Sequence, residues 1–379
     1  MAPKGIFRII KLEGINCAAA NILKQEMLSR GGEVVVSSQV YRLSAGAQTS
    51  ALLMGTMAQF RELISKLRMQ SLSSLQSVAD ELVRLLSSAG SPVGTHTRID
   101  GIDFQWNART YVMGIINVTP DSFSGDGTNG NIEKAVEQGK RFAESGADFL
   151  DIGGESTAPG SNPVSAEEEI SRVIPVLKKL RQETSIPISI DTSKSEVAKA
   201  ALAEGAGIIN DVWGLKKDDR MKNVISREKA MVILMHNRHA SEEVRFENKI
   251  GGFYQGADYS DLIGEICNSL RESINLALEA GIESEKILID PGIGFGKTPE
   301  QNLQVLRRLP ELKSLGYPIL LGTSRKSFIG RILKRHPNER LFGTAASIAL
   351  GIAGGANIVR VHDVEEMMQV ACIADAILV

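Results

Sequence analysis

The sequence predicts an α/β protein in which a (β/α)8 TIM barrel follows a small α/β domain. From residue 99 onward, short apolar segments alternate with amphipathic helical segments, which is the pattern of parallel βαβ units. The length of 379 residues suits a barrel of roughly 250 residues and a smaller domain of about 100. We therefore expect a front domain over residues 1–98 and a barrel over residues 99–379.

The front domain is predicted to alternate strands and helices before a linker. Asn16 stands where a helix N-cap is expected, and the small residues from Ser87 to Pro92 are typical of a linker. No catalytic set of residues is recognisable in this domain, so its role is left open. The expected elements are strand Ile6–Leu12, helix Asn16–Ser29, strands Glu33–Ser37 and Ala51–Gly55, and helices around Met57–Arg68 and Leu75–Leu86.

The second region contains eight predicted strands, each followed by a helical segment. Eight such units that end on a helix, here Val364–Ile377, are typical of a closed barrel. A doubly wound sheet usually has fewer strands, and no GxGxxG motif follows the first one. The predicted strands are Tyr111–Val118, Asp148–Gly153, Pro187–Asp191, Gly207–Asn210, Met231–Met235, Lys286–Asp290, Pro318–Gly322 and Asn357–Val361.

The composition excludes several classes of protein. Charged residues make up 23% of the chain, and the formal net charge of −2 argues against a dedicated nucleic-acid binder. The cysteines Cys17, Cys267 and Cys372 lack metal-ligand spacing, which indicates thiols in a reducing compartment. The N-terminal segment has no apolar core long enough for a signal peptide or a membrane span. We expect a cytoplasmic enzyme without nucleic-acid or membrane partners.

Polar residues stand where nearly every predicted strand of the barrel ends. Because the active site of such a barrel lies at the C-terminal ends of its strands, these residues would form one ring. Each of them could instead cap the next helix, and for Asp191 the two interpretations are equally open. The residues that leave the strands are Asn117, Gly153, Gly154, Glu155, Asp191, Asn210, Asp211, Met235, His236, Asp290, Ser324, Arg325, Lys326, Arg360 and His362.

The chemistry of this ring suggests two subsites. A carboxylate accepts two parallel hydrogen bonds, so carboxylates and amides suit a heterocycle with adjacent N–H and amino donors. The residues for that subsite are Asp191, Asn210 and Asp290. The candidates for an anion subsite are Asn117, Arg360 and His362. The sequence has neither a P-loop nor a metal cage, so any Mg²⁺ would be held by substrate oxygens, water and Asn117.

Seven motifs in this region resemble, in order, those of the dihydropteroate synthases, a family of pterin-binding TIM barrels. They cover about residues 107–379 and touch seven of the eight predicted strands. Residues 1–98 resemble an extension of some synthases in the family. The motifs are MGIINVTPDSFSGDG (113–127), DIGGEST (151–157), SIDTSKSEV (189–197), GIINDV (207–212), ILIDPGIGFGK (287–297), LLGTSRKSFIG (320–330) and IVRVHDV (358–364).

The resemblance implies a condensation of 6-hydroxymethyl-7,8-dihydropterin diphosphate with p-aminobenzoate, with Mg²⁺ as cofactor, in a homodimer. The implied pterin contacts are Asp191, Asn210, Met235, Asp290, Phe295 and Lys326. The implied p-aminobenzoate contacts are Thr157, Pro159, Phe295, Lys326 and Ser327. The implied diphosphate contacts are Asn117, Arg360 and His362, with Asn117 also toward the metal. The implied catalytic residues are Asp191, Lys326 and Asp126.

These groups favour an SN1-like mechanism. Diphosphate is a competent leaving group, and Asp191 could stabilise the positive charge that develops on the pterin methylene. The aryl amine is neutral at pH 7, so the chemistry does not require a strong general base such as His236. Simpler interpretations stay open for two residues: Phe295 could be loop packing, and Met235 could be a core filler.

The chain departs from the family pattern in its first two loops. The family usually has SFSDGG where this chain has SFSGDG, so the loop carboxylate is Asp126. The family usually has an arginine where this chain has Ala158. Arg238 and Lys297 are candidates for the missing charge, although both could be ordinary solvated residues.

Two further functions remain open for the sequence. A pterin-dependent corrinoid methyltransferase would share the barrel and the pterin contacts, but it needs no diphosphate subsite. A barrel without activity could serve as a binding or scaffold protein, because a fold alone does not fix a function.

Overall fold

The chain forms two compact units in the computed structural model, Met1–Gly90 and Ser91–Val379, and each is described by itself. The structure describes residues 3–38, 40, 47–88, 96–119, 131–156, 163–238, 244–247, 251–254 and 258–378. Over these ranges, no helix combines the length and the apolar character that crossing a membrane requires.

The front unit is built on a three-stranded antiparallel sheet with strand order β1–β3–β2. Alternate residues of β3, such as Ala51 and Leu53, are buried, so one face of the sheet carries the core. The predicted cap is confirmed, because Asn16 Oδ1 accepts a hydrogen bond from the Ala19 amide at 2.6 Å. The elements are β1 (Phe7–Asn16), α1 (Cys17–Leu28), β2 (Glu33–Val36), β3 (Gln48–Thr56), α2 (Met57–Arg68) and α3 (Ser73–Ser88).

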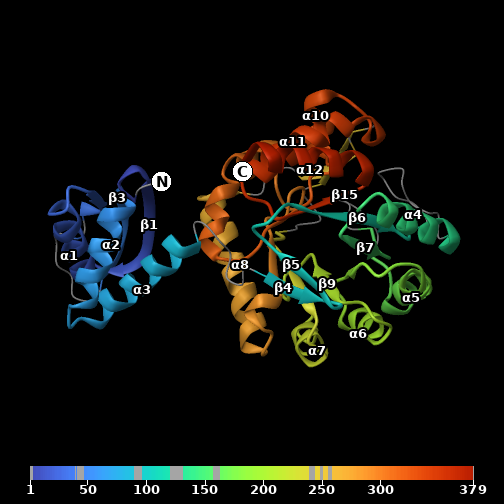
Figure 1. Ribbon diagram of the computed structural model, residues 1–379, viewed down its shortest axis with the longest axis horizontal. Helices are drawn as coiled ribbons and strands as arrows, with labels where there is room; N and C mark the ends of the chain where they lie inside the picture. The colour runs from blue at the N-terminus through green and yellow to red at the C-terminus, as the bar shows by residue number, and fades with distance from the viewer. Residues whose placement is uncertain are drawn as a thin grey trace. The chain divides into compact units, whose positions relative to one another are not determined.

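The second unit is the predicted barrel, with helices outside a ring of parallel strands (Figure 1). The order β13–β10–β9–β8–β7–β6–β15–β14 follows the chain around the ring, and a parallel bridge between Ile289 and Ile319 joins its ends. The strands are β6 (Tyr111–Asn117), β7 (Phe149–Gly153), β8 (Ile188–Asp191), β9 (Ile208–Asp211), β10 (Met231–Met235), β13 (Ile287–Asp290), β14 (Leu320–Leu321) and β15 (Ile358–Val361). The helices are α4 (Ile132–Glu144), α5 (Ala166–Glu183), α6 (Ser195–Ala203), α7 (Met221–Glu228), α8 (Leu262–Glu279), α9 (Pro299–Arg307), α10 (Ser327–Leu333), α11 (Leu341–Ala353) and α12 (Val364–Leu378).

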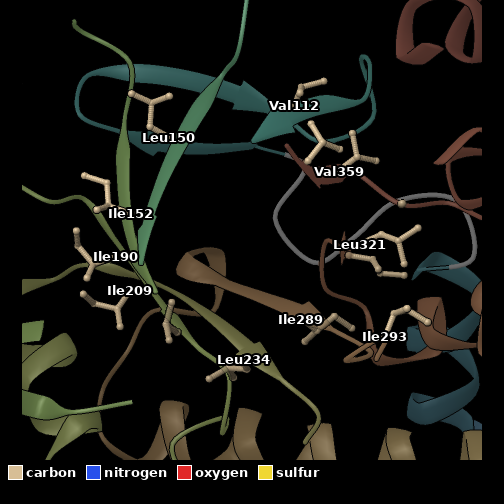
Figure 2. Packing of buried hydrophobic residues seen from close by; sticks show 14 of the residues in the cluster. Val112, Leu150, Ile152, Ile190, Ile209, Leu234, Ile289, Ile293, Leu321 and Val359 are labelled. Carbon is tan, nitrogen blue, oxygen red and sulfur yellow. The ribbon is translucent and has the colours of Figure 1, made fainter. Parts of the chain in front are cut away.

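The barrel strands are buried on both faces, which explains their continuous apolar sequences. The outward side chains, including Leu150, Ile190 and Val359, belong to the large core between strands and helices (Figure 2). The inward side chains near the strand starts form a separate buried cluster with Phe149, Ile208 and other apolar residues. The lower lumen is therefore filled by side chains, as expected for a barrel that is not a pore.

The inward positions change from apolar to polar toward the strand ends. Successive inward residues lie two positions apart, so Phe149 is followed by Asp151 in β7. The same step is seen in three other strands, from Ile208 to Asn210 in β9, from Leu288 to Asp290 in β13 and from Ile358 to Arg360 in β15. All of these polar residues are buried or half-buried. The upper lumen is therefore lined by charged and amide groups.

A hairpin that was not predicted, β4 (His96–Ile99) and β5 (Ile102–Gln105), belongs to the barrel unit. Its Thr97 Oγ1 donates to the Glu285 carbonyl at 2.7 Å, and Trp106 just beyond it joins the lower-lumen cluster. The domain boundary expected at residue 98 therefore falls inside β4, and the units divide at Gly90 instead. A second unpredicted hairpin consists of β11 (Val244–Glu247) and β12 (Gly251–Tyr254).

We expect the stability of the barrel to depend on the hairpin of β4 and β5 but not on the front unit. A chain that begins at Ser91 keeps Phe104 and Trp106, which are both buried in the lower lumen. A chain that begins at Asn107 loses both rings and should lose roughly 3–5 kcal/mol or more of its free energy of unfolding, the usual cost of deleting one buried aromatic side chain. Urea unfolding of the two chains measures the difference, and equal midpoints would contradict this role of the hairpin.

Candidate active site

Three predicted site residues lie in one row across the strand ends. The strand register pairs Asn117 with Gly153, Gly153 with Asp191, and Asp191 with Asn210. A Cβ atom built on Gly153 would lie 3.7 Å from Asn117 Oδ1 and 3.7 Å from Asp191 Cβ. The amide of Asn117 and the side chain of Asp191 therefore lie on either side of Gly153. The structure brings the amide and carboxylate groups together as the sequence predicted.

The charged and amide side chains that line the upper lumen are called the polar layer here. Arg360 lies inside this layer and joins two carboxylates. Its Nε donates to Asp151 Oδ2 at 2.5 Å, and its Nη2 donates to Asp191 Oδ2 at 2.7 Å. From the sequence, Arg360 is expected at the anion subsite and Asp191 at the heterocycle subsite. In the structure the two residues are direct partners, so the two subsites share this ion pair.

Asp151 is a residue of this site that the sequence analysis missed. Its side chain is fully buried, and its Oδ2 accepts hydrogen bonds from both Arg360 and Asn210 Nδ2, the latter at 3.1 Å. A carboxylate can only accept hydrogen bonds, so the NH₂ group of Asn210 must face it and the amide oxygen must point elsewhere. The available signal was a carboxylate at an inward position of a predicted strand, two residues before the strand ends.

The charges of this layer influence one another. Burial raises the pKa of Asp191 to about 7, against the opposing effect of the Arg360 charge. Burial disfavours the charge of Arg360, but Asp151 and Asp191 raise the pKa of the guanidinium above its ordinary value. Asp191 Oδ1 is buried and has no hydrogen-bond partner within the described ranges. The layer thus holds an arginine that stays charged and a carboxylate oxygen that can accept a further bond.

Asp290 lies at the end of β13, as predicted. Its Oδ1 accepts a hydrogen bond from the Gly292 amide at 2.7 Å, and its side chain is buried. Burial raises its pKa to about 6, although the Gly292 amide and the charge of Lys326 oppose this. Such a carboxylate can turn toward a ligand with paired N–H donors.

Lys326 and Phe295 form one wall beside this carboxylate. Lys326 Nζ lies 4.2 Å from the centroid of the Phe295 ring, which is a cation–π distance. Burial, and then the charge of Arg360, lowers the pKa of Lys326 to about 8. Phe295 also packs with Met235 and Val212 in a small apolar cluster. Met235 and Phe295 therefore line the polar layer instead of belonging to the main core.

The turn that presents Lys326 is held in place by an ion pair and a buried arginine. Arg325 has a left-handed backbone with φ of 57°, which is uncommon for a residue with a side chain. Its guanidinium pairs with Asp363 at 2.5 Å, and its carbonyl accepts from Arg340 Nη1 at 2.7 Å. Arg325 is therefore a support of the turn.

His362 and Ser327 lie at the ends of neighbouring elements. His362 Nδ1 lies 2.9 Å from Ser324 Oγ, which also accepts from the His362 amide at 3.2 Å. This pair orients the imidazole at the end of β15. Ser327 is the first residue of α10, directly after Lys326, and is half-buried.

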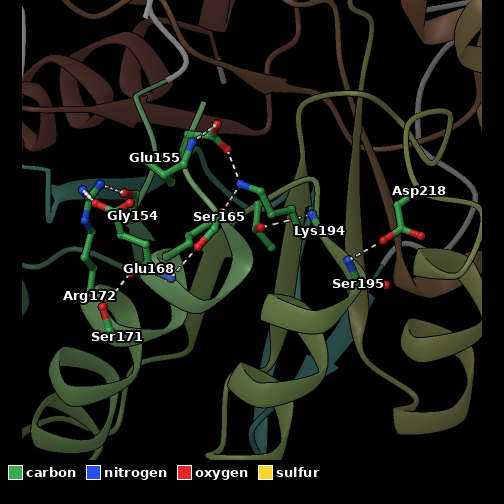
Figure 3. Close-up of polar contacts among 12 residues, drawn as sticks. Gly154, Glu155, Ser165, Glu168, Ser171, Arg172, Lys194, Ser195 and Asp218 are labelled. Atoms are coloured by element: carbon green, nitrogen blue, oxygen red, sulfur yellow. Dashed lines mark hydrogen bonds and ion pairs between the residues drawn. The ribbon is translucent and has the colours of Figure 1, made fainter. Parts of the chain in front are cut away.

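The base of the second loop is held by a buried ion-pair cluster (Figure 3). Lys194 Nζ pairs with Glu155 at 2.6 Å and also with Glu169, which is fully buried. Glu155 Oε1 also accepts from the Val164 amide at 3.3 Å. Arg172 donates to the Gly154 carbonyl at 2.7 Å. Glu155 is therefore part of the loop's support.

Three residues of the predicted site, Asp126, Thr157 and Pro159, lie outside the described residues, as does Ala158. Of the two candidate cations, Arg238 is exposed, pairs with Glu265 at 2.8 Å and lies over the Tyr259 ring. The interpretation of Lys297 as a solvated residue is wrong, because its side chain is 1% exposed. Its ammonium lies 2.8 Å from His236 Nδ1.

Comparison with known proteins gives the class to which this site belongs. A sequence profile described as "Pterin binding enzyme" matches residues 113–362, so the chain belongs to the pterin-binding enzymes. A dihydropteroate synthase of Synechocystis is 49% identical over 72% of this chain and 92% of its own length. A Xanthomonas albilineans dihydropteroate synthase, solved with 4-aminobenzoic acid, is 41% identical over 76% of this chain and 99% of its own, with a TM-score of 0.67. The chain belongs to the dihydropteroate synthase family.

One relative also matches the front unit. A probable bifunctional folylpolyglutamate synthase/dihydropteroate synthase of Halobacterium salinarum is 39% identical over 99% of this chain, which spans 43% of that protein. Residues 1–90 are therefore shared with a longer protein and are not peculiar to this chain.

Proposed function

We propose that the barrel condenses 6-hydroxymethyl-7,8-dihydropterin diphosphate with p-aminobenzoate to give 7,8-dihydropteroate and diphosphate. The observation that carries the proposal is the polar layer at the strand ends, where Asp191, Asn210, Asp290, Lys326 and Arg360 are brought together. The relatives named above bear this activity in their names. The direct test is formation of both products by the purified chain.

The pterin is proposed to bind across the layer, with its donor edge on Asp290. Asn210 supports this placement, because Asp151 fixes its NH₂ group and leaves its amide oxygen as an acceptor. Lys326 can donate to a ring acceptor, and Phe295 and Met235 offer apolar surface beside the ring. Recognition would therefore depend on a buried set of acceptors that match an amino-pyrimidine edge, which makes binding orientation-specific.

The diphosphate is proposed to bind near Asn117, Arg360 and His362. Mg²⁺ would fit only with help from the substrate, because the described residues contain no group of three acidic, histidine or cysteine side chains that could hold a metal. Asn117 would supply an amide oxygen, and the unpartnered Asp191 Oδ1 nearby is a second candidate ligand. When bound, the ion would neutralise charge on the leaving group.

Departure of diphosphate before attack by the amine is the proposed order. Asp191 faces the charge that would develop on the pterin methylene, and Arg360 keeps Asp191 in place. The amine of p-aminobenzoate is neutral and needs no base for its attack, and the proton that the new C–N nitrogen then loses is taken up by the departed diphosphate or by water. Phe295, Lys326 and Ser327 are the described residues proposed to contact p-aminobenzoate, and Thr157, Pro159 and the catalytic Asp126 remain proposals from the family resemblance.

A homodimer through barrel helices is proposed from an exposed apolar surface. Phe342 and Leu350 on α11, and Ile373 and Ile377 on α12, are between 65% and 85% exposed, and the two helices pack against each other. Large exposed apolar side chains on two packed helices are typical of protein interfaces. A cytoplasmic location is proposed because all three cysteines are free thiols.

We expect Phe342→Glu to convert the dimer to a monomer, because the 85% exposed ring would be replaced by a charge in the interface. Light scattering after gel filtration measures the mass. Leu278→Glu on α8, where the side chain is 41% exposed, is the matched control and should leave the mass unchanged. A wild-type monomer, or a Phe342→Glu dimer, would contradict this interface.

A further inference from the structure

The loop after β13 packs directly on the loop after β10. Gly292 and Gly296 have left-handed φ values of 69° and 56°. A Cβ atom would lie 1.9 Å from the His236 carbonyl oxygen at Gly292, and 1.6 Å from the Arg238 carbonyl oxygen at Gly296. No side chain fits at such distances, so the two backbones are in contact at two places.

Lys297 joins the same two loops through its side chain. Its Nζ donates to the Gly292 carbonyl at 2.9 Å and to the Phe295 carbonyl at 3.1 Å, and it lies 2.8 Å from His236 Nδ1. Three acceptors match the three donors of an ammonium group. Among the residues that the structure describes, no carboxylate forms an ion pair with it, and burial lowers the pKa of Lys297 to about 7, although the charge of Asp290 opposes this shift. The three acceptors stabilise the charged form of Lys297, which predominates below that pKa.

The contact with Lys297 determines the state of His236. In its charged form Lys297 can only donate, so His236 Nδ1 then accepts and the ring proton is on Nε2. Burial, and then the charge of Lys297, lowers the pKa of His236 to about 2, which agrees with a neutral ring. A neutral imidazole whose Nδ1 is already occupied is poorly suited to act as a general base at that atom.

The other side of the β13 loop faces the candidate active site. A Cβ atom on Gly294 would lie 3.0 Å from Lys326 Cδ, and the ring of Phe295 lies under Lys326 Nζ. The Gly294 amide donates to Asn302 Oδ1 at 2.7 Å, and Tyr259 Oη donates to the Gly296 carbonyl at 3.1 Å. A shift of this loop would therefore move Phe295 and, at the same time, the backbone against which the Lys326 side chain packs.

We propose that Lys297 is a positioning residue: its buried ammonium ties the loops after β10 and β13, fixes His236 as the Nε2–H tautomer, and thereby sets Phe295 and Lys326 for the reaction. The expected effect of Lys297 on the reaction rests on the proposed function, whereas the His236 tautomer is a property of the protein without substrate. Lys297 therefore serves the site through the loop that it anchors.

The test compares Lys297→Met, which keeps the volume and removes the charge, with the exposed Lys199→Met as control. We expect kcat/KM for p-aminobenzoate to fall by about 10²-fold in Lys297→Met, the effect of misplacing a site by about 1 Å. The control should be unchanged. Wild-type kinetics in a folded Lys297→Met protein would overturn the proposal, because packing alone would then explain the residue.

The second measurement is ¹⁵N NMR of the imidazoles at about pH 6, below the usual histidine pKa of about 6.5. The chain has 5 histidines, and a His236→Asn sample identifies the signals of that ring. We expect a neutral Nε2–H ring in the wild-type protein and loss of this state in Lys297→Met. A charged or Nδ1–H ring in the wild type overturns the proposal even if the variant does not fold. An inactive wild type with the expected ring would instead contradict only the proposed function.

Discussion

Replacement of Arg360 by methionine should lower the free energy of unfolding by about 3–5 kcal/mol, the usual effect of removing one partner of a buried ion pair. The loss is large because Asp151 and Asp191 would remain together in the lumen without their shared cation. Turnover should fall by about 10²–10³-fold, since the diphosphate would also lose a fixed positive charge. Denaturant unfolding and steady-state kinetics measure the two effects.

A second variant separates the two roles of Arg360. Adding Asp151→Asn to Arg360→Met removes one of the uncompensated carboxylates, so at least about 1 kcal/mol of stability should return. Turnover should not return, because the neutral amide introduced by Asp151→Asn supplies no cation to the leaving group. A single variant with wild-type stability would show that the ion pair in the lumen is unimportant.

Replacement of Asp290 by alanine should weaken pterin binding by about 1–3 kcal/mol, because buried donors of the ligand would lose their acceptor. The fold should survive, since Asp290 lies above the packed lower lumen and its carboxylate bonds only to the Gly292 amide within the described residues. Calorimetric titration with the pterin measures the loss. Unchanged affinity in a folded variant would show that Asp290 does not bind the pterin.

Asp211 provides the matched control, because it is another buried carboxylate at a strand end. Its Oδ1 and Oδ2 accept from the amides of Trp213 and Leu215 at 2.9 Å and 2.7 Å, so Asp211→Ala should reduce stability and leave pterin affinity intact.

The pH dependence of pterin affinity provides a further check. The pKa of Asp290 is raised to about 6, so pterin affinity should be full above that pH and should fall as the pH drops through it. Asp290→Asn should remove the part of the fall that is centred near pH 6.

Most of the fold could be predicted from the sequence, and the misses have physical causes. Parallel strands buried on both faces give continuous apolar segments, which is why β7, β9 and β10 were found close to their observed bounds. The hairpin of β4 and β5 was missed, although its sequence carried a signal. Asp100 and Gly101 both have positive φ, and an Asp-Gly pair between alternating residues is typical of a two-residue hairpin turn.

The site residues that stand at strand ends could be predicted from the sequence, whereas those that stand elsewhere were missed. Asp191, Asn210 and Asp290 stand at strand ends, so the barrel rule located them. Asp151 lies two residues before the end of β7, at an inward position of the strand. Its role depends on Asn210 in β9 and Arg360 in β15, and no local sequence pattern reveals these partners. Lys297 resembles a solvated lysine in sequence, because its burial comes from the meeting of two loops far apart in the chain.

The most direct test of this account follows both products of the reaction. Purified chain is incubated with 6-hydroxymethyl-7,8-dihydropterin diphosphate and Mg²⁺, with and without p-aminobenzoate, while diphosphate and dihydropteroate are measured. We expect equal amounts of diphosphate and dihydropteroate when p-aminobenzoate is present, and only slow release of diphosphate when it is absent. A folded chain that binds the pterin but forms no dihydropteroate under these conditions would contradict this expectation.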